Sequence, residues 1–324
     1  MTQFDRISLG RQAKKLGFVR DTFEKVCRLA DVLKFMEGDP VLKDSLALKG
    51  GTAINLTIFD LPRLSVDIDL DYSRDVPRED MLEERVLIKT HIQKYMEASG
   101  YTFSSKSKDY HALDSLVYEY TNAGGVKDNL KIEINYMLRC HVMPISRRTV
   151  NLPWNEDRLT VLSVEPMEIF SAKSVALLNR AAPRDLYDMF NMQKFGLFDE
   201  SEGQKFRKCI MFYAAIASER APMEIDLKGI GEISAQKIKT DLTPVLRRGE
   251  RFDLETARKQ VKEYLSGILR PTEEELLFWK LFSEGDYRPE LLFGESVIID
   301  RIKAHPMAVW KCNKNRSCPA LRHF

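Results

Sequence analysis

The chain has 324 residues, of which 44% are hydrophobic and 30% charged, and its formal net charge is +2. This composition is typical of globular proteins, and the near balance of charge neither requires nor excludes an anionic partner. The longest purely apolar run, residues 209–217, is far shorter than the roughly 20 residues of a membrane-spanning helix, so we expect no membrane segment. The N-terminus lacks the apolar stretch of a secretory signal. The five scattered cysteines favour a reducing cytoplasm over a disulfide framework.

The first elements in chain order predict a helix and then a strand, a glycine turn and a second helix. Residues 18–36 repeat apolar groups at helical spacing. The short apolar stretch 45–48 predicts a strand that leads into Gly50 and Gly51, and residues 53–59 predict the helix that follows. This order is typical of a phosphate cradle, because exposed backbone N–H groups and the positive end of a helix both favour an anion.

Residues 65–71 alternate strictly, which predicts a strand with Asp67, Asp69 and Asp71 on one face. An acidic strand face alone is more often a solvated edge. A calcium loop is excluded because Tyr72 stands where glycine is needed. Carboxylates roughly 7 Å apart along a strand repel unless a cation lies between them. Hard oxygen ligands of this kind suit Mg²⁺, and Mn²⁺ is an alternative.

The chain then continues with further elements of an acidic sheet. Residues 77–99 predict a long helix, and 101–105 and 116–121 predict strands. Another strand is expected at 130–137, with Glu133 on its polar face. Glu133 is our candidate for a third carboxylate. Such a set suits phosphoryl transfer, in which two metal ions about 4 Å apart activate an attacking hydroxyl and stabilise the leaving oxygen.

After about residue 165 the pattern becomes mostly helical. The expected helices are 167–180, 184–195, 204–218, 253–269, 272–283 and 296–304. The sequence therefore predicts an α+β fold, with an N-terminal helical segment at 1–44, an α+β core at 45–165 and a helical lobe at 166–324.

Four segments together resemble a known family. They are Lys49-Gly50-Gly51-Thr52-Ala53-Ile54-Asn55-Leu56, Arg63-x-Ser65-x-Asp67-Ile68-Asp69-Leu70, Ala172-Lys173 followed by Arg180, and Pro183-Arg184-Asp185-Leu186-Tyr187-Asp188-Met189. In this order they resemble the motifs of the AbiEii-type nucleotidyltransferase toxins, within the DNA polymerase β-like superfamily. The resemblance covers residues 45–195. It implies a polymerase β-like nucleotidyltransferase core with a mixed sheet, followed by a helical C-terminal lobe.

The resemblance also implies roles for individual side chains. The implied metal ligands are Asp67, Asp69 and Glu133. The implied catalytic set is Asp67, Asp69, Glu133, Lys173, Asp185 and Asp188. The implied nucleotide-binding set is Lys49, Gly50, Gly51, Thr52, Arg63, Ser65 and Lys173.

For Lys173 and the residues that follow it in the motifs, the sequence alone leaves other interpretations open. Lys173 taken by itself reads as a surface lysine, and its ammonium could equally neutralise phosphate. Asp185 could complement the dipole of a helix start. Structural salt bridges are an alternative role for Arg180 and Arg184. We nevertheless expect Lys173, Asp185 and Asp188 to close over the same cleft as the acidic strand.

The activity implied by the resemblance is metal-dependent transfer of a nucleoside monophosphate from an NTP to a hydroxyl acceptor. The family suggests RNA, particularly a tRNA 3′ end, as acceptor. It also suggests a cytoplasmic toxin–antitoxin or phage-defence setting with a partner antitoxin. One alternative is transfer to a small molecule or to a protein. The other is a nucleotide- or RNA-binding module without turnover.

Overall fold

The computed structural model describes residues 4–154, 158–217 and 225–317. The chain divides into two compact units. Unit 1 comprises Met1–Arg139, Ile145–Val164 and Thr243–Arg251. Unit 2 comprises Cys140–Pro144, Glu165–Leu242 and Phe252–Phe324. Among the described residues, no helix combines the length and the apolar character needed to cross a membrane.

Unit 1 is built on one mixed β-sheet. Its strands are β1 (Leu46–Lys49), β2 (Asp67–Tyr72), β3 (Thr102–Phe103), β4 (Lys108–Asp109), β5 (Leu113–Thr121), β6 (Lys127–Asn135), β7 (Ser146–Val150) and β8 (Leu159–Ser163). They lie in the order β3-β5-β6-β2-β1-β8-β7, with β4 paired to β5. The β2–β6 and β1–β8 pairs are parallel and the other pairs antiparallel. The expected α+β fold with a mixed sheet is confirmed.

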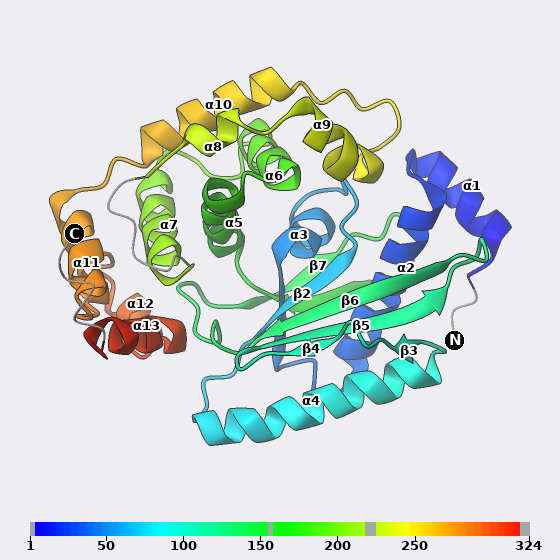
Figure 1. Cartoon of the computed structure of the whole chain (residues 1–324), viewed down its shortest axis with the longest axis horizontal. Coiled ribbons are helices and arrows are strands. Elements are labelled where there is room, and N and C mark those ends of the chain that lie inside the picture. Colours follow the sequence, from blue (N-terminus) through cyan, green and yellow to red (C-terminus); the bar gives the residue numbers. More distant parts are fainter. Residues whose placement is uncertain (1–3, 155–157, 218–224, 318–324) are drawn as a thin grey trace. The chain divides into compact units, whose positions relative to one another are not determined.

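Two long helices of unit 1, α2 (Arg20–Gly38) and α4 (Arg78–Ala98), cover one face of this sheet (Figure 1). The helices of unit 1 are α1 (Arg6–Leu16), α2 (Arg20–Gly38), α3 (Gly50–Ala53), the π-helix η1 (Ile54–Ile58), α4 (Arg78–Ala98) and the 3₁₀ turn η3 (Thr243–Val245). The apolar face carries Ile68 and Leu70 of β2, both at most 2% exposed. Phe35 of α2 stacks on Tyr95 of α4, with ring centroids 3.9 Å apart. Tyr72, which points to the apolar side, donates to Glu84 of α4. The alternation of strand side chains therefore leaves the acidic residues on the opposite face.

The helix expected at 53–59 begins earlier than the sequence suggested. The helical stretch opens at Gly50 as α3, with Lys49 as its N-cap residue, and continues as the π-helix η1. Both glycines therefore lie in the first helical turn. π-Helical turns are rare and occur often at functional sites.

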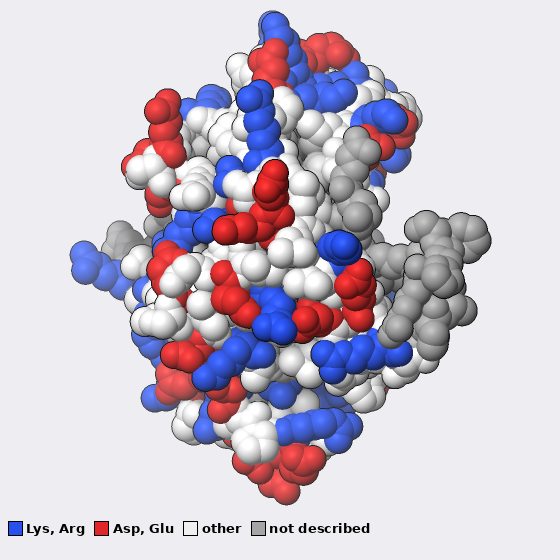
Figure 2. All heavy atoms as spheres, turned by 90° about the vertical axis from the view of Figure 1, so that its left-hand side faces the viewer, with Lys and Arg blue, Asp and Glu red and all other residues white. Residues whose placement is uncertain are grey.

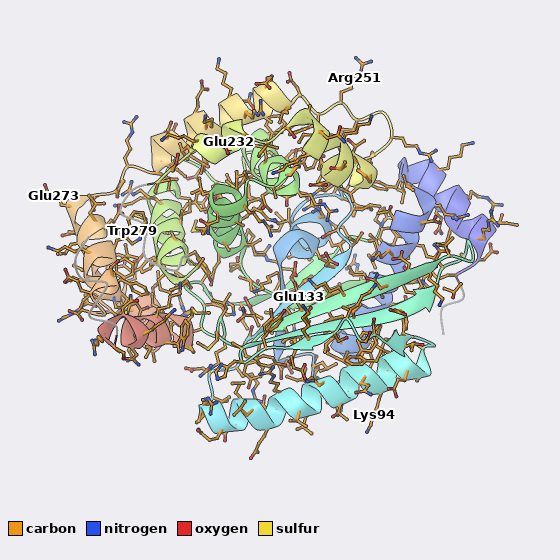
Figure 3. All side chains as sticks on the ribbon, viewed as in Figure 1. Lys94, Glu133, Glu232, Arg251, Glu273 and Trp279 are labelled. Atoms are coloured by element: carbon orange, nitrogen blue, oxygen red, sulfur yellow. The ribbon has the colours of Figure 1, made fainter. Side chains whose placement is uncertain are left out.

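In the described part of unit 2, the regular secondary structure is all helical. Its helices are α5 (Pro166–Arg180), α6 (Pro183–Lys194), α7 (Gly203–Ala217), α8 (Lys228–Gly231), α9 (Ala235–Lys237), the π-helix η2 (Ile238–Leu242), α10 (Leu254–Ile268), α11 (Glu273–Ser283), the 3₁₀ turn η4 (Pro289–Leu291), α12 (Ser296–Ile302) and α13 (Pro306–Ser317). Trp279 of α11, labelled in Figure 3, is buried and donates from Nε1 to Met211 O of α7 over 2.9 Å.

A buried carboxylate ties the segment Cys140–Pro144 to the helices of unit 2. Glu168 of α5 accepts from the backbone N–H of Met143 (2.9 Å) and from the hydroxyl of Tyr213. Nδ1 of His141 lies 3.1 Å from Glu168 Oε1. Burial acts to raise the pKa of Glu168, but His141, Tyr213 and the backbone N–H outweigh it and leave the pKa lowered. A charged, hydrogen-bonded Glu168 is thus part of the core of unit 2.

Charges are mixed on the face of the molecule drawn in Figure 2, where Lys and Arg alternate with Asp and Glu. This distribution agrees with the near-zero net charge of the sequence.

Candidate active site

The acidic residues of β2 and β6 lie side by side on one face of the sheet. In the parallel β2–β6 pair, Asp69 is aligned with Glu133 and Asp67 with Lys131. Aligned residues of neighbouring strands point to the same side. Asp67, Asp69 and Glu133 therefore share the polar face, opposite the face that α2 and α4 cover, and all three are partly exposed. Figure 3 labels Glu133 on β6. We call this the acidic face: Lys49 of β1, the three Asp residues of β2, and Lys131 and Glu133 of β6.

Two lysines partly neutralise the acidic face. Lys131 Nζ lies 2.9 Å from Glu133 Oε1. Lys49 is aligned with Asp69, and its Nζ lies 2.5 Å from Asp71 Oδ1. Partial burial acts to lower the pKa of Lys131, but the hydrogen bond and charge of Glu133, with smaller contributions from the β2 carboxylates, leave it raised. Two lysines thus face four carboxylates, and the acidic face keeps a formal charge of −2.

The glycine turn lies directly against the acidic face. Gly50 has a φ of +66°, in the left-handed region that favours glycine. A Cβ at Gly50 would overlap the carboxylate of Asp69. A Cβ at Gly51 would lie 2.9 Å from Arg63 Nη2 and 3.0 Å from Ser65 Oγ. Only glycine lets the backbone approach these side chains so closely, so the predicted turn residues and Asp69 are brought together within unit 1.

The turn is braced by a residue that the sequence analysis did not assign a role. Asn55 is fully buried, and its Nδ2 donates to Gly51 O over 2.7 Å while its Oδ1 accepts from the backbone N–H of Arg63. Thr52 Oγ1 donates to the carbonyl of Asp67 over 2.5 Å. The signal for Asn55 was a polar side chain between the apolar residues Ile54 and Leu56, because buried polar groups need partners.

A distant segment of the chain completes the brace. Leu64 donates from its backbone N–H to Val245 O over 2.8 Å, and Arg63 forms an isolated antiparallel bridge with Leu246. Arg247 Nη2 donates to Leu61 O over 3.1 Å. The loop that enters β2 is therefore held by Thr243–Arg251, a part of unit 1 that lies far along the sequence.

We expect Gly50→Ala to reduce activity far more than it reduces stability. A left-handed alanine costs roughly 1–2 kcal/mol, and its Cβ would also displace the Asp69 side chain. The control is Gly125→Ala, because Gly125 has a φ of +83° but a Cβ there meets open space. Thermal unfolding and nucleotidyl-transfer assays compare the two variants. Equal losses of activity would show that backbone strain alone is responsible.

The second group of sequence-predicted residues forms an ion-pair network within unit 2. Lys173 Nζ lies 3.0 Å from Asp185 Oδ1 and 3.3 Å from Asp188 Oδ2, and both carboxylate side chains are 1% exposed. Arg180, which is 63% exposed, places Nε 2.7 Å from Asp185 Oδ2. Burial acts to raise the pKa of Asp185, but Lys173 and Arg180 leave it lowered. Arg184 Nε donates to Asp241 O over 2.8 Å. The implied role of Lys173 toward nucleotide phosphate stays a prediction.

The acidic face offers oxygen donors of the kind that a divalent cation binds. Carboxylate oxygens suit Mg²⁺, which takes one or two protein carboxylates together with substrate phosphates, and the formal charge of −2 on the acidic face favours a cation there. In the described part of the chain, no three His, Cys, Asp or Glu side chains converge as a ready metal site. Glu133 is instead engaged by Lys131. The Asp67 and Asp69 pair fits a substrate-assisted metal site.

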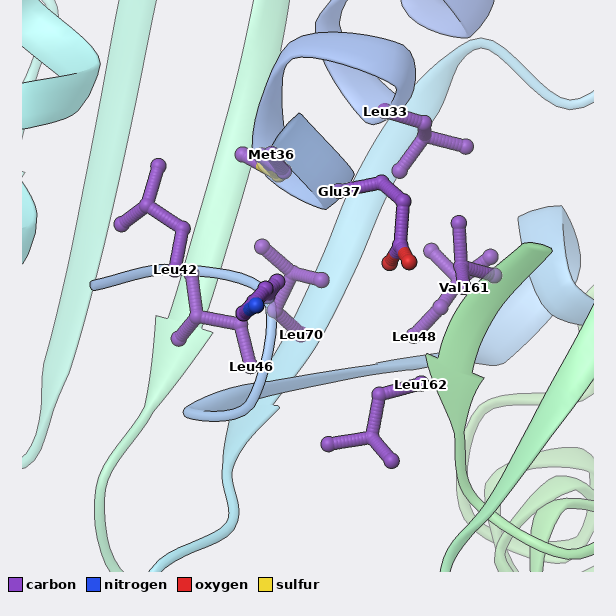
Figure 4. Close-up of a pocket in the computed structure, with 10 residues that line it drawn as sticks. Leu33, Met36, Glu37, Leu42, Leu46, Leu48, Leu70, Val161 and Leu162 are labelled. Atoms are coloured by element: carbon purple, nitrogen blue, oxygen red, sulfur yellow. The ribbon is translucent and has the colours of Figure 1, made fainter. Parts of the chain in front are cut away.

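The pocket drawn in Figure 4 belongs to the other face of the sheet. It is lined mainly by apolar side chains of α2, β1, β2 and β8, including Leu33, Leu48 and Leu70. Leu70 alternates with Asp69 along β2, so this pocket is separate from the acidic face.

Comparison with known proteins identifies the family. The model of the nucleotidyl transferase AbiEii toxin family, of the type IV toxin–antitoxin system, matches residues 34–283. The chain belongs to the AbiEii nucleotidyltransferase toxin family. This AbiEii protein is therefore a nucleotidyltransferase, and both the resemblance and the enzyme class predicted from the sequence are confirmed.

Solved structures show the same fold at low sequence identity. MenT4, a nucleotidyltransferase toxin from Mycobacterium tuberculosis H37Rv, is 15% identical, with a TM-score of 0.63 over 95% of this chain and 99% of its own. No curated protein matches the sequence. The family places the AbiEii protein in a toxin–antitoxin system, with an NTP as substrate and an antitoxin as partner. A binding module without turnover does not fit this assignment.

Proposed function

We propose that this AbiEii protein transfers a nucleoside monophosphate from an NTP to a hydroxyl of RNA, with a tRNA 3′ end as the acceptor, in a Mg²⁺-dependent reaction at the acidic face. The observation that carries the proposal is the packing of the Gly50–Gly51 turn against the Asp69 carboxylate. A turn that presents backbone N–H groups to phosphate is thereby adjacent to oxygen ligands for a cation.

In the proposed transfer, different residues of the site hold the cation and orient the phosphates. The acceptor oxygen forms a bond to the α-phosphorus, the bond from that phosphorus to the β-phosphate oxygen breaks, and pyrophosphate leaves. Asp67 and Asp69 would hold the divalent cation, which when bound neutralises charge and polarises phosphate oxygens. The backbone N–H groups of Gly50, Gly51 and Thr52 would orient the phosphates, because the Thr52 hydroxyl is bound to Asp67 O, while Arg63 and Ser65 support the turn. Mn²⁺ shares the preference for oxygen ligands and is the alternative ion.

Glu133 is proposed to complete the carboxylate set and to accept the proton of the attacking hydroxyl. Its alignment with Asp69 on the same face supports this role. We expect Glu133→Gln to lower the rate of transfer by about 10²–10⁴-fold, the usual contribution of a general base. Single-turnover kinetics measures the loss. Glu119→Gln is the control, because Glu119 of β5 is also partly exposed but is aligned with Asn129 and not with a residue of the acidic face. A Glu133→Gln rate within a few-fold of the wild type would remove Glu133 from the mechanism.

The acceptor is tested directly. Total RNA is incubated with the protein, Mg²⁺ and each labelled NTP in turn, and the labelled species are separated by size and sequenced. Label at tRNA 3′ ends supports the proposal. Label on protein, or on a small molecule, would support the alternative acceptors instead. Asp69→Ala protein gives the background.

We place the reaction in the cytoplasm, where NTPs and tRNA occur together, and in a phage-defence setting. Among the described residues, four cysteines are buried and lie outside any disulfide bond, which agrees with a reducing compartment. Growth of cells that express the protein with and without its antitoxin, before and after phage infection, tests this setting.

A further inference from the structure

We propose that Lys131 is a positioning residue that holds Glu133 away from the Asp67 and Asp69 pair while no cation is bound, and that it turns to the triphosphate when Glu133 joins the carboxylate set. The inference rests on the proposed function of the acidic face. It assigns a further residue, from β6, to the nucleotide side of the site.

Lys131 lies next to both Glu133 and Asp67 on the acidic face. It lies two residues before Glu133 on the same face of β6, with Nζ 2.9 Å from Glu133 Oε1. Across the strand pair it is aligned with Asp67. The third carboxylate is therefore engaged by Lys131, and in the described residues Glu133 does not form a three-carboxylate cluster with Asp67 and Asp69.

The two lysines of the acidic face differ in how firmly they are held. Lys49 binds Asp71, whose side chain is only 5% exposed. The side chains of Lys131 and Glu133 are 36% and 29% exposed. A pair that solvent reaches gains little from its own attraction and is easily exchanged. Lys131 is thus the lysine that a competing cation can release.

A released Lys131 would still lie on the face that binds the triphosphate. An ammonium group is a compact point charge with three donors and suits phosphate oxygens. The same charge repels a divalent cation when no nucleotide is present. Removing it should therefore strengthen binding of the bare cation and weaken use of the NTP. A purely structural lysine would not move these two quantities in opposite directions.

The test uses Lys131→Gln and Lys131→Met in the full chain. Mn²⁺ binding without nucleotide is followed by electron paramagnetic resonance, and KM for the NTP is measured separately from kcat. We expect both variants to bind Mn²⁺ roughly three- to tenfold more tightly, with a KM raised by a similar factor. Lys131→Arg should restore both values. Lys127→Gln is the matched control, because Lys127 lies on the same strand but is exposed at its far end.

The outcomes separate this inference from the proposed function. Asp69→Asn should lose Mn²⁺ binding; if it binds as the wild type does, the acidic face is not the metal site and the proposed function fails. If Asp69→Asn loses binding but both Lys131 variants bind Mn²⁺ no more tightly than the wild type, the role of Lys131 alone is overturned. Melting temperatures confirm that each variant is folded.

Discussion

Replacing Asp69 with Ala should lower nucleotidyl transfer by about 10³-fold or more and leave the AbiEii protein folded. Asp69 is central on the acidic face: it is aligned with Glu133 on one side and Lys49 on the other, and it contacts the glycine turn. Without Asp69 the site would hold the divalent cation poorly, so the negative charge of the triphosphate would not be neutralised. Loss of one electrostatic stabiliser typically costs about 10²–10³-fold in rate. Release of pyrophosphate from NTP in the presence of RNA and Mg²⁺ measures the effect.

The matched control for this prediction is Asp75→Ala. Asp75 is an exposed carboxylate just beyond the end of β2, so its removal changes the net charge of the chain equally. It should keep wild-type activity. Activity of Asp69→Ala within a few-fold of the wild type would exclude Asp69 from the mechanism.

Lys173→Ala should destabilise the protein by about 3–5 kcal/mol, the usual effect of removing one partner of a buried ion pair. Lys173 is 10% exposed and is shared by the buried carboxylates of Asp185 and Asp188. The structure thus assigns this lysine a clear part in the stability of unit 2, in addition to the nucleotide role that the family resemblance implies. Urea unfolding measures the loss.

Arg180→Ala is the control for Lys173→Ala. Arg180 contacts the same Asp185, but its side chain is 63% exposed, so its loss should cost at most about 1 kcal/mol. Equal destabilisation by the two variants would contradict the assignment. Transfer assays on Lys173→Met, below its unfolding transition, then separate nucleotide binding from stability: loss of turnover in the folded protein supports the role implied by the family.

The sequence predicted the acidic strand because its pattern is local. Alternation with period two is visible within residues 65–71, and it places Asp67 and Asp69 on one face whatever the strand pairs with. The Gly50–Gly51 turn was visible for a similar reason, since few other residues accept such a backbone. Lys173 and Asp185 were recognised as site candidates only through the family motifs, because the sequence around a single helical lysine does not show which residues it contacts.

Other features depend on contacts between distant residues and could not be predicted. The register that sets Glu133 beside Asp69 is decided by strand pairing and not by either strand alone. Strands β7 and β8 are short, and β7 pairs at the edge of the sheet, so their periodicity was too weak to recognise. The brace from Asn55 to the glycine turn, and the ion pair that occupies Glu133, appear only when the fold is complete.

The segment Thr243–Arg251 belongs to unit 1 but is synthesised long after the rest of that unit. The eight described strands of the sheet have all been synthesised by Ser163. The residues that hold Leu61 and Leu64, at the entrance to the acidic strand, follow some 80 residues later. Between them the chain must first pass through α5 to η2 of unit 2. A nascent toxin therefore carries its acidic residues long before it can brace them, and the finished site becomes available only late in translation.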